Sequence, residues 1–271
     1  MQAGNPAYPA IFLIHPIGGD IYFYRDLVKA LPSEYPMYAI RSPMLTTEVQ
    51  YRSLEEMANT YLEMIEPYLG GLTPVLAGSS FGGIVAYEMA MQYKEKHDVS
   101  LPVAMIDSPC YGNLPESMSS LEILDYLMTF GMADIKLDWS QYDSMDSLEE
   151  KIEYLGQVSH DTAYESILSA SFLPKYLKVW ECNNQLMQNY EAKGSDSHLL
   201  FFSHTEEIPG FPTDQDKFWK RLGHASFRVV PASGNHLTMN GPLNSEFLAR
   251  HLSQWSQDKC VEMSELSESS S

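Results

Sequence analysis

Short, uninterrupted runs of apolar residues recur along the chain, and they alternate with segments in which apolar residues are spaced three and four apart. Such runs are typical of strands buried on both faces of a parallel sheet, and the spaced segments are typical of amphipathic helices. The alternation predicts βαβ units with right-handed crossovers and therefore an α/β fold with a mostly parallel central sheet. The predicted strands are residues 10–14, 37–40, 74–77, 102–106, 198–202 and 226–230.

Three helices are predicted within the alternating part of the chain. Ser53 is the expected N-cap of the first, because Glu56 stands three residues later, at the capping-box position. Residues 81–93 and 243–255 form the other two. The uncharged stretch 67–87 is long enough to cross a bilayer, but it contains two prolines and five glycines. We therefore interpret it as a turn, a buried strand, a second turn and the start of a helix.

The alternation breaks between residues 108 and 193, where only helical periodicity is visible. Ordinary crossover helices are one interpretation, but crossovers seldom need three helices, so we favour a helical lid inserted at about 110–190. We expect one domain over residues 1–256 and a disordered Ser/Glu-rich tail over 257–271. The helices predicted within the lid are residues 121–130, 147–158 and 172–190.

Composition excludes several classes of protein. Hydrophobic residues make up 44% of the 271 positions, which excludes a disordered chain, and the net charge of −19 argues against binding nucleic acid or anionic membranes. Cys110, Cys182 and Cys260 are odd in number and lack paired spacing, which argues against a disulfide framework and against a zinc site. Residues 1–6 lack the basic and apolar regions of a signal peptide, so we expect a cytoplasmic protein without a membrane span.

The strongest chemical signal is a G-x-S-x-G pattern that runs from Gly78 to Gly82 and centres on Ser80. The pattern alone is weak, but the predicted strand before it and the predicted helix after it form the context of a nucleophile elbow. A serine there stands at the carboxyl end of the sheet and at a helix N-terminus, where developing negative charge is stabilised. Ser80 is therefore the predicted nucleophile.

A serine hydroxyl needs a base, and His236 is the best-placed histidine. It follows the last predicted strand and precedes the final helix, so its loop lies at the same sheet edge as Ser80. His204 also ends a strand and is the second candidate for the base, whereas His15 is expected to shape the loop after the first strand. The remaining histidines, expected at the surface or in packing roles, are His97, His160, His198, His224 and His251.

The base needs an acid that holds its tautomer, and Asp107 closes the strand next to that of Ser80. The rivals are Glu206 and Glu207, which follow a later strand but look like a solvated pair. We favour Asp107, and the resulting chain order of Ser, Asp and His is typical of α/β-hydrolases.

An oxyanion hole would complete the site. The residue after the nucleophile, Phe81, is expected to supply one backbone N–H. The second is expected from Ile17, in the glycine-containing loop 15–19 after the first strand.

Together these motifs resemble the thioesterase domain that ends polyketide synthases and nonribosomal peptide synthetases, over roughly residues 8–255. The resemblance rests on Leu13–Gly19, Tyr24–Leu27, Gly78–Gly83, Ile106–Ser108 and Gly234–His236. It implies an α/β-hydrolase fold, the acid at Asp107 and a helical lid. The His15-Pro16 opening is closer to the chain-terminating (type I) domains than to freestanding editing (type II) thioesterases, whereas Ser79 departs from the Trp or Tyr of many relatives.

The resemblance also implies the substrate, an acyl thioester on the phosphopantetheine arm of an acyl or peptidyl carrier protein. Ser80 would take the polyketide or peptide chain, and water or an internal nucleophile would release it by hydrolysis or macrocyclisation. No cofactor of the domain itself is expected. Carrier proteins are usually acidic, so a body of charge −19 favours delivery within one polypeptide or assembly line. Arg25, Arg41 and Arg52 form a possible basic dock, unless Arg25 pairs with Asp26 or Asp20.

Other functions share much of this pattern. A carboxylesterase or lipase acting on free esters would have the same strand, elbow, acid and base. A freestanding editing (type II) thioesterase is a further alternative. A catalytically dead hydrolase-fold binding protein would lack one member of the triad, and none is missing.

Overall fold

The computed structural model describes residues 2–69, 72–109, 118–130, 132, 135–162, 164–208, 211 and 213–269. Within these ranges, no helix combines the length and the apolar character that crossing a membrane requires. The uncharged stretch 67–87 contains a strand and the start of a helix in its described part, as its prolines and glycines predict.

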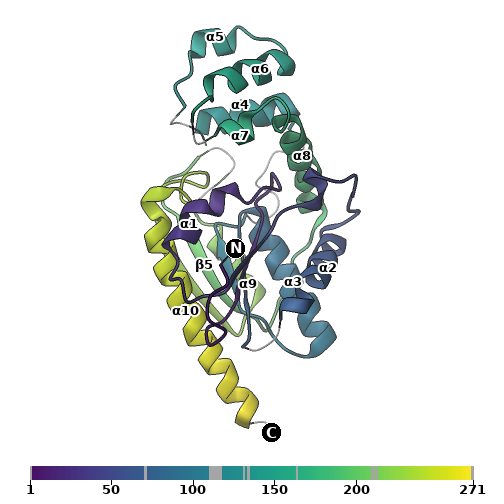
Figure 1. The fold of residues 1–271 in the computed structure, drawn as a ribbon. Helices are drawn as coiled ribbons and strands as arrows, with labels where there is room; N and C mark the ends of the chain where they lie inside the picture. Colours follow the sequence, from purple (N-terminus) through teal and green to yellow (C-terminus); the bar gives the residue numbers. More distant parts are fainter. Residues whose placement is uncertain are drawn as a thin grey trace.

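A parallel sheet forms the centre of the molecule (Figure 1). Its described strands are β1 (Ile11–Ile14), β2 (Met37–Ile40), β3 (Val75–Ser79), β4 (Val103–Ile106), β5 (His198–His204) and β6 (Ser226–Ala232). They lie in the order β2-β1-β3-β4-β5-β6, and each neighbouring pair is parallel. Each of the predicted apolar runs corresponds to one of these strands, so the predicted α/β fold with a parallel sheet is confirmed.

Helices cover both faces of the sheet, which explains why the strands are apolar at successive positions. Ile11 and Leu13 point into a cluster with α1 and α10, while Phe12 and Ile14 point into a cluster with α2, α3 and α9. Figure 1 shows α10 on one side of the sheet and α2 with α3 on the other. These helices are α1 (Arg25–Ala30), α2 (Leu54–Ile65), α3 (Phe81–His97), α9 (Asp216–Leu222) and α10 (Pro242–Ser269). Short 3₁₀ helices lie at Tyr22–Tyr24, Pro43–Leu45 and Glu66–Tyr68.

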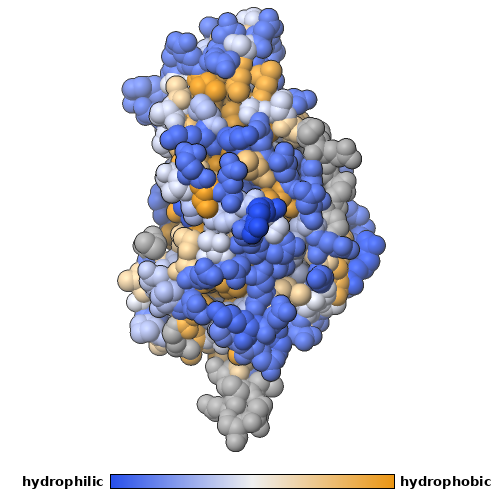
Figure 2. Space-filling model, turned by 90° about the vertical axis from the view of Figure 1, so that its right-hand side faces the viewer, coloured by the Kyte–Doolittle hydropathy of each residue, from blue (hydrophilic) through white to orange (hydrophobic). Residues whose placement is uncertain are grey.

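The segment between β4 and β5, here named the lid, is helical in its described residues and contains no strand there. Its helices are α4 (Ser120–Phe130), α5 (Trp139–Asp143), α6 (Leu148–Val158), α7 (Glu165–Leu168) and α8 (Leu173–Asn189). They bury their own apolar cluster above the carboxyl ends of the strands, and α8 descends to the body (Figure 1). Apolar side chains gather on the upper, lid part of one face, whereas the body below is mainly hydrophilic (Figure 2). The beginning of the predicted lid, 110–117 with Cys110, lies outside the described residues.

The prediction of a disordered tail is wrong, because α10 continues from Pro242 to Ser269 and does not end near residue 255. The physical reason is that one face of this extension is covered: Cys260 is buried. Lys259 and Glu262 form an ion pair at 2.5 Å, and Glu262 lies 3.9 Å from His198 at the start of β5.

The strand order also fixes where a ligand can bind. From β1 the chain adds β2 on one side, and from β3 onward it builds the sheet on the other side. In open α/β sheets, the crevice for ligands lies outside the carboxyl ends of the strands at this reversal point. The loops after β1 and β3, which carry residues 15–19 and Ser80, occupy that place.

Candidate active site

Ser80 lies at a sharp turn between β3 and α3. Its backbone has φ 53° and ψ −124°, a conformation that residues other than glycine rarely adopt. The Ser80 N–H donates to the Ile106 carbonyl at 2.8 Å, which fixes the turn against β4. A Cβ on Gly82 would overlap the Ile14 carbonyl oxygen, so glycine lets α3 begin directly against the end of β1. The structure thus has the strained strand-turn-helix that the G-x-S-x-G pattern predicts.

Two further side chains hold the strand that carries the nucleophile. The buried Tyr24 hydroxyl donates to the Ile14 carbonyl at 2.6 Å and accepts from the Ser79 N–H at 2.7 Å. Asn240 Nδ2 donates to Ser79 Oγ at 2.7 Å. Tyr24 therefore ties β1 to β3 immediately before Ser80. Tyr24 belongs to one of the motifs in the sequence, but the sequence does not indicate its role. Nothing in the sequence indicates that Asn240 contacts Ser79.

The structure brings the predicted nucleophile, base and acid together. His236 Nε2 lies 2.9 Å from Ser80 Oγ, although 156 positions separate the two residues. His236 Nδ1 lies 2.6 Å from Asp107 Oδ2. All three residues are buried. In this arrangement Nδ1–H donates to the carboxylate and Nε2 accepts from the serine hydroxyl, which is the tautomer that a general base needs.

Asp107 is held in a strained position at the end of β4. Its φ is 53°, and its N–H donates to the Phe202 carbonyl of β5 at 2.8 Å. Burial opposes ionisation of the carboxyl group, but hydrogen bonds from His204 and His236 outweigh burial and hold the pKa of Asp107 below its usual range. The rivals Glu206 and Glu207 are exposed, and the described hydrogen bonds of His236 do not include them.

His204, the second candidate for the base, contacts the acid instead of the nucleophile. His204 Nδ1 lies 2.6 Å from Asp107 Oδ2, the same oxygen atom that His236 contacts. Sequence reasoning missed this contact, because it treated the two histidines as competitors for one role. The donor set of Asp107, His204 and His236 also has the composition of a metal site. Ligand atoms of a tetrahedral ion lie about 3.3 Å apart, so these shorter spacings favour hydrogen bonds.

Histidine 15 shapes the loop after β1, as the sequence predicts. His15 Nδ1 donates to the Pro16 carbonyl at 2.7 Å, and Nε2 accepts from the Tyr61 hydroxyl at 2.6 Å. Complete burial lowers the pKa of His15 to about 4, so the ring is neutral at pH 7. Asn183 of α8 donates to the Ile17 carbonyl at 2.7 Å, which orients the peptide on the lid side of the loop.

The two predicted oxyanion donors lie on segments that meet. Phe81 is the first residue of α3, where backbone N–H groups have no partner within the helix. The rings of His15 and Phe81 stack with centroids 6.0 Å apart, so the loop of Ile17 adjoins the N-terminus of α3. A Cβ on Gly18 would overlap the ring of Tyr176, which shows that α8 packs directly on this loop.

The arginines considered as a basic dock are each paired with an acid. Arg25 lies 3.2 Å from Asp26, as one of the sequence alternatives proposed. Arg41 lies 2.7 Å from Asp20. Arg52 lies 3.0 Å from Glu56 of α2. These pairs leave little uncompensated positive charge, so the structure gives no support to the dock.

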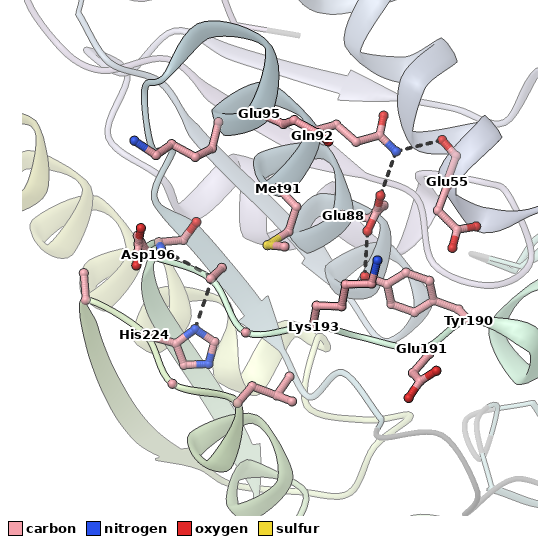
Figure 3. A pocket seen from close by; sticks show the side chains of 17 residues that line it. Glu55, Glu88, Met91, Gln92, Glu95, Tyr190, Glu191, Lys193, Asp196 and His224 are labelled. Carbon is pink, nitrogen blue, oxygen red and sulfur yellow. Dashed lines mark hydrogen bonds between the residues drawn. The ribbon is translucent and has the colours of Figure 1, made fainter.

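A cavity of about 640 Å³ lies at the opposite edge of the sheet, near the start of β5 and β6 (Figure 3). Glu88 projects into it and accepts hydrogen bonds from Gln92 and Tyr190. Ser195 Oγ lies 3.3 Å from His224 Nδ1, but the other ring nitrogen of His224 donates to a backbone carbonyl. This Ser–His contact therefore lacks the acid of a triad. The candidate catalytic residues are those at the edge of the sheet that carries Ser80.

Comparisons with known proteins identify the family of this chain. The family model of the thioesterase domain matches residues 9–256. The non-reducing polyketide synthase PKS16 of Cladonia grayi is 36% identical over 131 residues, which cover 45% of this chain and 6% of that protein. The atromentin synthetase invA2 of Paxillus involutus is 29% identical over 259 residues, which cover 84% of this chain and 25% of that protein.

A solved structure shares the fold. RedJ, a thioesterase from the prodiginine biosynthetic pathway in Streptomyces coelicolor, aligns with a TM-score of 0.69 and 19% identity over 94% of this chain and 93% of RedJ. The chain spans only 5–6% of the length of three polyketide synthases that it matches. Because the family model covers nearly the whole chain, this chain belongs to the thioesterase domain family.

Proposed function

We propose that this chain is a serine thioesterase that releases an acyl chain from a carrier protein through an acyl-Ser80 intermediate. The observation that carries the proposal is the continuous contact from Ser80 Oγ through the His236 ring to Asp107. A thioesterase needs a nucleophile that attacks the thioester carbonyl, and an isolated serine hydroxyl is too weak a nucleophile at neutral pH.

In the acylation step, Ser80 Oγ attacks the thioester carbonyl while its proton moves to His236 Nε2. Asp107 stabilises the imidazolium that forms, and the N–H groups of Phe81 and Ile17 stabilise the oxyanion. The tetrahedral intermediate then collapses, the carbon–sulfur bond breaks, and the imidazolium gives its proton to the departing thiolate. The products are acyl-Ser80 and the free thiol of the phosphopantetheine arm.

In the release step, His236 takes a proton from the incoming nucleophile, which attacks the ester carbonyl of acyl-Ser80. The bond to Ser80 Oγ breaks, and His236 returns the proton to that oxygen. Water gives a free acid, whereas a hydroxyl or amine of the acyl chain gives a ring. Both outcomes use the same three residues.

The proposed partner is an acyl or peptidyl carrier protein in the same polypeptide or assembly line. The matched relatives are named as polyketide synthases and peptide or atromentin synthetases, of which this chain spans only a small part. The net charge of −19 supports tethered delivery, because it disfavours long-range capture of a separate acidic carrier.

Turnover of two substrate classes tests the proposal against a free-ester hydrolase. We expect acyl-pantetheine thioesters to be cleaved with a higher kcat/KM than aryl esters of the same acyl chain. The Ser80→Ala variant is the control and should fold normally while losing both activities. A strong preference for the aryl esters would overturn the thioesterase assignment.

A further inference from the structure

His204 sits between two hydrogen-bond acceptors at the end of β5, and its side chain is fully buried. Nδ1 lies 2.6 Å from Asp107 Oδ2, and Nε2 lies 3.0 Å from the Phe211 carbonyl oxygen. A carboxylate and a carbonyl can only accept, so each contact is a hydrogen bond only if the facing nitrogen carries a proton. A neutral ring carries only one N–H, so the lone pair of its other nitrogen would face an acceptor oxygen. The geometry therefore fits an imidazolium.

The charges around His204 favour the same protonation state. Asp107 faces it from β4, His236 from the loop between β6 and α10, and Glu207 from the segment after β5. Burial opposes the charge, but the hydrogen bond and charge of Asp107 outweigh burial, with further support from the Phe211 carbonyl and Glu207, so the pKa of His204 is raised.

The carboxylate of Asp107 is shared between the two histidines. Its Oδ2 accepts from both Nδ1 atoms, whereas its buried Oδ1 has no hydrogen-bond partner among the described residues. The orientation of Asp107 therefore depends on His204 as much as on His236. Without His204, the Asp107 carboxylate loses one charged hydrogen bond. The carboxylate can then rotate, and the base His236 is held less firmly.

His204 also fixes the residue that covers the base. Its Nε2–H holds the Phe211 carbonyl, and the Phe211 ring stacks on the His236 ring with centroids 3.6 Å apart and an interplanar angle of 14°. An aromatic face is a favourable neighbour for a cation, so this stacking suits the imidazolium that forms on His236 during the reaction.

We propose that His204 is a positioning residue that acts as a standing imidazolium: it orients Asp107 and, through the Phe211 carbonyl, keeps the aromatic ring on His236. The inference rests on the proposed function, in which Asp107 and His236 act on Ser80. It adds a second histidine, with a different protonation state, to the acid side of the triad.

The pH profile of kcat/KM for acyl-pantetheine hydrolysis separates this role from a merely structural one. In His204→Gln, kcat should fall about tenfold to a hundredfold, the equivalent of one hydrogen bond to a charged group. The wild-type profile should also fall as the pH rises through the raised pKa of His204, and this alkaline loss should be absent in His204→Gln, which has no imidazolium to lose. The matched control, His198→Gln at the other end of β5, should keep the wild-type profile. A uniform loss at all pH values, or no loss, would overturn the proposal.

A measurement on the wild-type protein covers the case in which His204→Gln does not fold. Long-range ¹H–¹⁵N NMR correlations should show both ring nitrogens of His204 protonated at pH 7.5. Observation of a neutral tautomer there would overturn the proposal. This result does not depend on turnover, so it stands apart from any failure of the thioesterase assignment.

Discussion

Two of the buried histidines at the rim of the sheet, His15 and His204, have opposite properties. His15 follows β1 on the oxyanion side, and His204 ends β5 on the acid side. His15 has one acceptor and one hydroxyl as partners, so a neutral ring satisfies both contacts. His204 has two acceptors, so only a charged ring does. At the same edge of the sheet, His15 is thus a neutral structural residue and His204 is a cation, because their hydrogen-bond partners differ.

The rim therefore has two halves with separate tasks. The oxyanion half shapes backbone N–H groups and needs no formal charge near the developing oxyanion. The acid half holds Asp107 ionised, with its negative charge shared by His204 and His236. Changes to the acid half should therefore act on proton transfer, whereas changes to the oxyanion half should act on packing and on the placement of donors.

The largest expected effect comes from Asp107→Asn, which removes the charge that the acid half is built around. We expect kcat to fall about 10⁴-fold, because the base loses its tautomer and the imidazolium loses its counter-ion. Steady-state kinetics of thioester hydrolysis measure this. The matched control, with Glu206→Gln and Glu207→Gln together, should stay within about twofold of wild type, since solvated charges couple weakly. A greater loss in the control than in Asp107→Asn would reverse the assignment of the acid.

On the oxyanion half, Gly18→Ala should reduce kcat by about a hundredfold, the typical cost of one displaced oxyanion donor. The new methyl group would collide with the Tyr176 ring of α8 and push the loop away. Gly156→Ala in α6 is the matched control, since its Cβ would meet its nearest neighbour at 3.7 Å, and it should leave kcat unchanged. Adding Tyr176→Ala to Gly18→Ala should restore part of the activity, and an unchanged loss would contradict this packing explanation.

The two histidines should give stability opposite pH dependences. The pKa of His15 falls from 6.5 to about 4 on folding, so the unfolded chain binds its proton more readily and stability drops by about 3 kcal/mol as the pH falls through that window. The pKa of His204 is raised, so its contribution is complete below about pH 6.5 and is lost as the pH rises through the folded-state value.

Urea unfolding between pH 4.5 and 8 measures these slopes. We expect His15→Gln to flatten the loss on the acid side and His204→Gln to flatten the loss on the alkaline side. If the unfolding free energy depended equally on pH in the wild type and in both variants, His15 and His204 would not differ in protonation as described.

The smallest effect is expected at the paired arginines outside both halves. Arg41→Gln and Arg52→Gln should each change the free energy of unfolding by less than about 1 kcal/mol and leave thioester turnover unchanged, because exposed ion pairs contribute little. Thermal unfolding and assays with a carrier-bound substrate check this. A selective rise in KM for the carrier-bound substrate would restore the docking role that the sequence suggested.

The sequence predicts the parts of this molecule that depend on neighbours along the chain. Apolar runs reveal the strands, and the strand order places Ser80, Asp107 and His236 at one edge, because parallel strands end together. It does not reveal that His204 contacts Asp107, because the two residues are 97 positions apart and no local pattern reports a hydrogen bond over that separation. Nor does it reveal that Tyr24 joins β1 to the elbow.

The tail shows the opposite failure of local evidence. A composition rich in serine and glutamate suggests disorder, yet Cys260 is buried and α10 continues past it. Packing against the body is a long-range property, and so the composition of a short segment did not predict it.

Peptide mass spectrometry after brief incubation with an acyl-pantetheine thioester shows directly whether Ser80 carries the acyl group. We expect a mass increase of one acyl group on the peptide that contains Ser80, and no such increase in Ser80→Ala. Thioester consumption at equal rates by both proteins, or acylation of a different residue, would contradict this expectation.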